Sequence, residues 1–141
     1  MRERFNSAAF AGNTALCKIT EDLIFTEPYI VAANNRWTSP QLDTLAQSIR
    51  NDQDLKIAVS RLKLKFLGAA EALLHGDLHT GSVMLTLSDT RIIDPEFAFI
   101  GPMGFDVGAV IANLLISYFS QDGHETHPGA RDGYREWLLT T

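Results

Sequence analysis

Ionisable residues that could do chemistry gather in one stretch of the chain, residues 73–99. The segment "HGDLHTGS", residues 75–82, contains two histidines and Asp77, and "IIDPE", residues 92–96, adds Asp94 and Glu96. Carboxylates that lie close together repel one another unless cations are present, and oxygen ligands favour magnesium or manganese. Any one of these acids taken alone is better explained by a structural role: Asp77 as the cap of a turn, Asp94 as the residue before proline at the end of a strand, and Glu96 as a solvated side chain. The functional interpretation therefore depends on their joint placement.

The segments "VMLTL" and "RII", separated by "SDT", predict a β-hairpin after this loop. We expect a three-residue turn at 88–90, and antiparallel pairing then places Asp94 near Met84. The same pairing places Glu96 near Ser82. Both acids return to the loop that precedes the hairpin, which favours a divalent metal site there.

Two helices are predicted upstream of this loop. The first begins with Ser39 as N-cap and Pro40 at the first helical position. The second begins at Asp52 and continues at three- and four-residue apolar spacing to Leu74. Residues 5–35 are weakly patterned and are expected to be loop with short ordered pieces.

Two further helices are predicted downstream. The segment "VGAVIANLLISYFSQ", residues 107–121, is apolar nearly all round, as expected of a helix buried in a domain interior. Asp106, directly before it, is expected to be either its N-cap or an anchor for the backbone of the loop. The chain closes on "YREWLLTT", residues 134–141, which predicts a short helix.

Composition narrows the classes of function. The chain has 141 residues, 45% of them hydrophobic, which is enough to build one globular domain. The formal charge of -5 argues against nucleic acid or an acidic lipid surface as the main partner. The longest apolar stretch, residues 107–119, is shorter than the roughly 20 residues that span a bilayer. The single cysteine and the absence of an apolar leader at the N-terminus indicate the cytoplasm.

The spacing of His75, Asp77 and His79 leaves a different chemistry open. In an extended segment all three side chains could bind one zinc ion, as in a metal-dependent hydrolase. The alternative for the histidines is a structural role. We expect that role for His75, with its ring packed under the loop and hydrogen-bonded to the backbone.

The two segments together resemble the catalytic half of the kinase-like phosphotransferases. His75 and Asp77 match the loop H-R-D-L-x-x-x-N, Ser82 stands where the asparagine is expected, and Asp94 stands at the D-F-G aspartate. Gly76 replaces the loop arginine, and little chain is left for an activation loop. These departures indicate a small-molecule kinase of the aminoglycoside-phosphotransferase-like group.

Within that group the chain most resembles the 5-methylthioribose kinase family. The resemblance covers nearly the whole chain and rests on "HGDLHTGS", "DPEFAF", "GPMGFD", "ITEDLIFTEPY" and "NRWTSPQLD". It implies an α+β fold, the mostly helical C-terminal lobe of a protein-kinase-like fold, with a small β-hairpin carrying the catalytic loop. The implied reaction is transfer of the γ-phosphoryl group of ATP to the 1-hydroxyl of methylthioribose in methionine salvage.

The resemblance also implies roles for individual residues. Asp77 would orient the sugar hydroxyl and accept its proton, while Asp94 and Glu96 would hold Mg²⁺ or Mn²⁺ beside the ATP phosphates. Ser82 would contact the cofactor, and Glu96 would supply the metal ligand that the missing asparagine provides elsewhere.

The nucleotide clamp of such a kinase has no counterpart in the sequence. There is no G-x-G-x-x-G, and Lys18, Lys56, Lys63 and Lys65 do not lie in a predicted strand. We expect residues 1–141 to be a partial C-terminal lobe, without the N-terminal nucleotide-binding lobe and the C-terminal end, and to show little turnover alone. A non-enzymatic alternative is a binding or regulatory half that pairs with a full-length subunit. A homodimer is implied only by analogy with the family.

Overall fold

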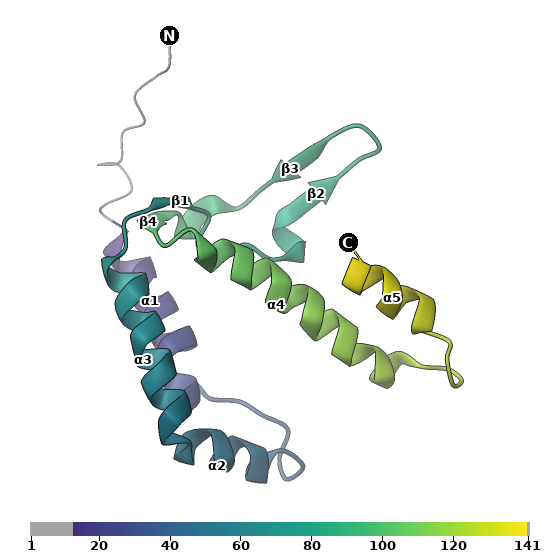
Figure 1. Ribbon diagram of the computed structural model, residues 1–141, viewed down its shortest axis with the longest axis horizontal. Helices are drawn as coiled ribbons and strands as arrows, with labels where there is room; N and C mark the ends of the chain where they lie inside the picture. The colour runs from purple at the N-terminus through teal and green to yellow at the C-terminus, as the bar shows by residue number, and fades with distance from the viewer. Residues whose placement is uncertain (1–12, 141) are drawn as a thin grey trace. The chain divides into compact units, whose positions relative to one another are not determined.

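The computed structural model describes residues 13–140, which form two compact units (Figure 1). The first unit holds the described residues up to Leu74 together with Phe97–Pro102. The second holds His75–Glu96 and the chain from Met103 onward. Both combine helices with a two-stranded antiparallel sheet, so the expected α+β class is confirmed.

The first unit is built on two helices that pack side by side, α1 (Thr14–Phe25) and α3 (Gln53–Gly68) (Figure 1). Its other elements are η2 (Glu27–Tyr29), α2 (Asp43–Asn51), β1 (Ala72–Leu74) and β4 (Phe99–Gly101). The core is centred on Phe66, whose ring centroid lies 5.2 Å from that of Phe25 and 5.0 Å from that of Phe99. Three elements of the unit are thus joined by one aromatic cluster.

Helix α1 was not expected from the sequence, which predicted that residues 5–35 are loop with short ordered pieces. Residues 5–12 lie outside the described part, and 14–25 are helical. The side that faces α3 carries Cys17, Glu21 and Phe25 at four-residue spacing. A glutamate in the middle of this stripe breaks the apolar pattern. Its charge is satisfied by Lys63 of α3, whose Nζ lies 2.7 Å from Oε1 of Glu21.

The expected start of α2 at Ser39 and Pro40 is wrong, because the helix begins at Asp43. The residues before it form a turn closed by the Asp43 carboxylate. This carboxylate accepts hydrogen bonds from the indole N–H of Trp37 at 2.7 Å and the hydroxyl of Ser39 at 3.1 Å. Ser39 therefore stabilises the turn before the helix and is not the N-cap, which is Leu42.

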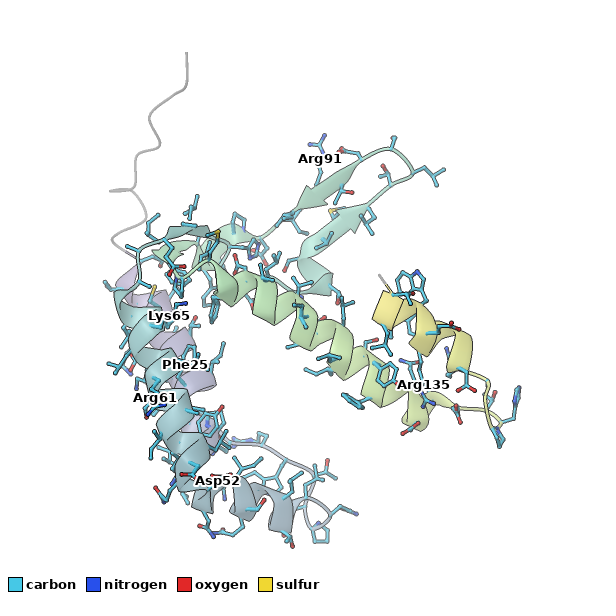
Figure 2. The ribbon with its side chains drawn as sticks, in the orientation of Figure 1. Phe25, Asp52, Arg61, Lys65, Arg91 and Arg135 are labelled. Atoms are coloured by element: carbon cyan, nitrogen blue, oxygen red, sulfur yellow. The ribbon has the colours of Figure 1, made fainter. Side chains whose placement is uncertain are left out.

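Helix α3 begins as expected and ends earlier. Asp52 (labelled in Figure 2) is its N-cap, because the side chain accepts a hydrogen bond from the backbone N–H of Leu55 at 2.8 Å. The expected end at Leu74 is wrong, because α3 stops at Gly68 and Leu74 pairs with Phe99 in the β1–β4 sheet. The apolar spacing of residues 70–74 fits a helix, but pairing of β1 with the distant strand β4 makes residues 72–74 a strand.

The second unit contains the loop 75–82, a β-hairpin and two helices. Its elements are η3 (Thr80–Ser82), β2 (Val83–Leu85), β3 (Thr90–Ile92), α4 (Gly104–Ser120), η5 (Gln121–His124) and α5 (Asp132–Thr140); η4 (Pro95–Phe97) follows the hairpin. The predicted hairpin and closing helix are confirmed. Arg135 of α5 pairs with Asp122, Glu125 and Asp132, which ties α5 to the connection that leads into it (Figure 2).

The expectation that α4 is buried is wrong for the described residues. Large apolar side chains along it stay exposed, among them Val107, Ile111, Ile116 and Phe119, the last at 70%. An all-round apolar helix is buried only where neighbours cover every side, and within its unit α4 packs mainly against α5, η5 and η3. Among residues 13–140, none of the helices is both long and apolar enough to cross a membrane.

Candidate active site

The loop that follows β1 is held by a carboxylate of α4. Asp106, 9% exposed in the first turn of that helix, accepts hydrogen bonds from the backbone N–H of His75 at 2.6 Å and of Gly76 at 3.0 Å. Gly76 has φ +85°, a conformation that residues with a Cβ seldom adopt, so glycine suits this close approach. The expected anchoring role of Asp106 is confirmed. The alternative role as N-cap is wrong, because Met103 occupies that position.

His75 has the structural role expected of it. Its Nδ1 accepts the backbone N–H of Asp77 at 3.3 Å, and its Nε2 lies 2.8 Å from the carbonyl oxygen of Ile93. These partners assign the proton of the neutral ring to Nε2. Both ring nitrogens are thereby engaged with backbone groups, one in the loop and one at the end of the hairpin, which leaves neither for a zinc ion.

Ser82 joins the loop to the hairpin. It is 4% exposed, and its hydroxyl donates to the carbonyl of Asp77 at 3.3 Å. Its N–H donates to the carbonyl of His79 at 2.9 Å, and its own carbonyl accepts from Ile93 at 3.0 Å. The hydroxyl is thus engaged with the loop backbone, and contact with a cofactor remains a prediction.

The hairpin has a different register from the expected one. Val83 lies opposite Ile92 and Leu85 opposite Thr90, so the chain turns at residues 87 and 88. The turn is closed by Thr86, whose N–H donates to the carbonyl of Asp89 at 2.8 Å and whose hydroxyl oxygen accepts from the N–H of Asp89 at 2.9 Å. These local bonds favour a tighter turn than the three residues expected.

The register changes where the two downstream acids lie. Pairing ends with the hydrogen bond between Ile93 and Ser82, so Asp94 and Glu96 come after the strand and do not lie opposite Met84 and Ser82. Asp94 has φ +64°, a left-handed conformation that few residues other than glycine, asparagine and aspartate adopt. Such outliers concentrate at functional sites.

The three predicted acids, Asp77, Asp94 and Glu96, are all exposed. No three side chains of His, Cys, Asp or Glu gather into a ready-made metal-binding group within the described residues, so the acids do not form one cluster there. Mg²⁺ commonly takes one or two protein carboxylates and completes its shell with water and phosphate oxygens. Exposed carboxylates that flank a turn at Pro95 fit that requirement.

Asp77 combines a fixed backbone with an accessible carboxylate. Its N–H and its carbonyl are held by His75 and Ser82, while its side chain stays 60% exposed. One carboxylate oxygen lies 3.8 Å from Nε2 of His79. A side chain presented in this way can accept a proton from a bound hydroxyl.

One contributor to the loop was missed from the sequence. The side-chain oxygen of Asn113, on α4, accepts the hydroxyl of Thr80 at 2.6 Å and its N–H at 3.3 Å. The available signal was an amide interrupting an otherwise apolar helix. Residues of that kind inside apolar segments usually have a specific polar partner.

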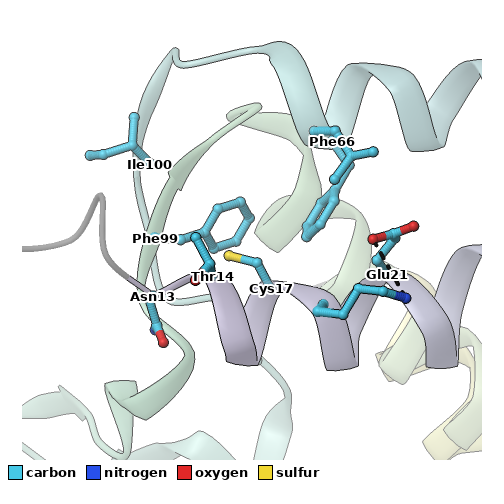
Figure 3. A pocket seen from close by; sticks show the side chains of 9 residues that line it. Asn13, Thr14, Cys17, Glu21, Phe66, Phe99 and Ile100 are labelled. Carbon is cyan, nitrogen blue, oxygen red and sulfur yellow. Dashed lines mark ion pairs between the residues drawn. The ribbon is translucent and has the colours of Figure 1, made fainter.

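The first unit has a separate cavity of about 390 Å³ between α1, α3 and β4 (Figure 3). Phe66 and Phe99 line it together with Cys17, and an ion pair between Lys18 and Glu21 lies at its polar side. Burial raises the pKa of the Cys17 thiol, which makes it less reactive than an ordinary cysteine. None of the predicted site residues lines this cavity.

Comparison with known proteins gives a consistent result. The model of the phosphotransferase enzyme family matches residues 4–138. The chain is 50% identical to methylthioribose kinase 1 of Oryza sativa subsp. japonica over 134 residues, which make up 95% of this chain and 31% of that relative. It is 54% identical to methylthioribose kinase of Escherichia coli O45:K1 over 133 residues, 94% of this chain and 32% of the relative. The chain spans about a third of the length of the curated relatives it matches.

Proposed function

Because the chain belongs to the phosphotransferase enzyme family, we propose that it carries the proton acceptor and the metal ligands of a methylthioribose kinase. The reaction is transfer of the γ-phosphoryl group of ATP to the 1-hydroxyl of 5-methylthioribose, a step of methionine salvage. The names of the relatives, at about half identity along nearly the whole chain, support this substrate. The single cysteine supports a cytoplasmic location.

The presentation of Asp77 is the observation that carries the proposal. Phosphoryl transfer depends on positioning and charge stabilisation more than on covalent chemistry by the protein. His75 and Ser82 fix the backbone on both sides of Asp77, so its exposed carboxylate is held in place to orient the sugar hydroxyl and take its proton. Asp94 and Glu96 would hold Mg²⁺ or Mn²⁺, which supplies positive charge beside the phosphates.

The phosphates of ATP need a second set of contacts. Within the described part of the chain, the lysines lie on helices α1 and α3, and no strand carries one. We therefore expect little turnover by the 141 residues alone. Turnover should appear when the chain is extended to the length of its relatives.

The test is a phosphorylation assay with ATP, Mg²⁺ and methylthioribose on the chain alone and on the extended protein. Asp77→Asn in the active form should lower kcat by about 10²–10⁴-fold. Asp89→Asn removes the same charge from the exposed hairpin turn and should leave kcat unchanged. Inactivity of the extended protein on this sugar would overturn the substrate, and an unchanged kcat in Asp77→Asn would overturn the role of that residue.

A second candidate function is a non-catalytic half that associates with another kinase subunit or with a second copy of itself. The exposed apolar side chains of α4 favour it, because contiguous apolar surface commonly marks an interface. Sedimentation alongside the turnover assay separates the two functions. Stable association without turnover in the complex supports the second function. A chain that sediments as a monomer both alone and when mixed with the extended protein contradicts it.

A further inference from the structure

His79 is held firmly although its side chain is 45% exposed. Its Nδ1 accepts the backbone N–H of Gly81 at 3.0 Å. The ring also lies against Gly81, because a Cβ at that position would fall 2.8 Å from Cε1 and 2.9 Å from Nδ1 of the ring. The next residue, Thr80, is bonded to Asn113 of α4 through both its N–H and its hydroxyl. The ring therefore has little freedom to rotate.

The bond from Gly81 also decides which ring nitrogen carries the proton. A nitrogen that accepts a hydrogen bond cannot be protonated, so in the neutral ring the proton is on Nε2. That nitrogen is the one 3.8 Å from Oδ2 of Asp77. The distance exceeds that of a hydrogen bond, yet catalytic bonds in free enzymes are often long and tighten when substrate binds.

We propose that His79 is a positioning residue for Asp77. The Nε2–H of His79 holds Oδ2 of Asp77 and leaves the other carboxylate oxygen to face the acceptor hydroxyl. This inference rests on the proposed function, because it presumes that Asp77 is the proton acceptor. It assigns His79 neither to a metal nor to direct contact with substrate.

The competing explanation is that His79 only caps the short helix η3 through Gly81. Two substitutions separate these roles. In His79→Asn the side-chain oxygen takes the place of Nδ1 and keeps the cap, but nothing reaches Asp77. In His79→Gln the terminal amide takes the place of Nε2 and keeps a donor towards Asp77, but the cap is lost.

The kinetic test uses the active, extended protein. His79→Asn should lower kcat about 10- to 100-fold with KM for the sugar unchanged, since one directed hydrogen bond to a charged group has about this effect. His79→Gln should retain most of kcat. In an Asp77→Asn background, His79→Asn should have no further effect. The opposite order, with Gln impaired and Asn normal, would show that the cap is all that matters and overturn the proposal.

A second measurement does not depend on activity. Two-bond ¹H–¹⁵N correlation spectra of the protein distinguish the tautomers of its four histidines. His79 should have its proton on Nε2, and Asp77→Asn should shift the Nε2 signal of His79 while the exposed His124 and His127 stay unchanged. A proton on Nδ1, or a signal that does not respond, would overturn the proposal. A response in the spectra combined with no turnover on methylthioribose by the extended wild-type protein would instead count against the proposed function.

Discussion

The carboxylate of Asp106 accepts the backbone N–H of His75 at 2.6 Å, across a sequence separation of 31 residues. The same carboxylate takes the N–H of Gly76, so one buried side chain satisfies two consecutive donors of the loop. Charge-assisted bonds of this kind are about twice as strong as bonds between neutral groups. This contact ties the loop that carries Asp77 to helix α4.

Asp106→Asn should loosen the loop. An amide can accept only one of the two hydrogen bonds with its oxygen, and its N–H₂ group would face the other backbone N–H. We expect a cost of about 1–3 kcal/mol, the range for an unsatisfied buried donor. The measurement is amide hydrogen exchange, which should become faster at His75 and Gly76 in Asp106→Asn than in the wild type. Asp89→Asn in the hairpin turn is the control, and equal protection in both variants would contradict the prediction.

Thr80 and Asn113 should behave as a coupled pair. The hydroxyl of Thr80 donates to the side chain of Asn113 at 2.6 Å, so the loss of this bond is counted only once when both partners are removed. A double-mutant cycle of Thr80→Val and Asn113→Ala should give a coupling free energy of about 0.5–1.5 kcal/mol in urea unfolding. Thr80→Ser keeps the hydroxyl and serves as the matched variant. Additive effects would show that the contact contributes nothing.

Asp52→Ala should destabilise the first unit by about 0.5–2 kcal/mol, because the N-cap bond to Leu55 is lost. Asp54→Ala removes a carboxylate from the same first turn without removing the cap and should cost only a few tenths of a kcal/mol. Urea titration of both variants provides the comparison. Equal losses would mean that the helix responds to charge near its N-terminus and not to the capping bond.

Cys17 should make stability fall at alkaline pH. Burial raises the pKa of its thiol, so between the unfolded and the folded pKa the native state binds more protons than the unfolded chain. The free energy of unfolding then decreases as pH rises through that interval. Cys17→Ala should remove this slope. Iodoacetamide, with no other cysteine to react, should label the native chain at higher pH than the urea-unfolded chain, and identical labelling profiles would contradict the prediction.

Features that depend on near neighbours were predictable from the sequence. Asp52 caps α3 through a residue three positions away, and the hairpin and the closing helix follow from short patterns. The register of the hairpin, however, depended on specific bonds. Thr86 and Asp89 close a tighter turn than expected, so Asp94 and Glu96 do not lie opposite Met84 and Ser82.

The sequence by itself determined which residues are available for chemistry: an acid and two histidines in one loop, followed by two further acids. Tertiary structure decided how they are held, because the deciding partners are distant. Lys63 pairs with Glu21, the residue that interrupts the apolar pattern of helix α1. Pairing of β1 with β4 places Leu74 in a strand and not in helix α3. Asp106 and Asn113 of α4 hold the loop by hydrogen bonds. A pattern within a few residues cannot encode a buried charge whose partner comes from another helix, since only folding brings the two together.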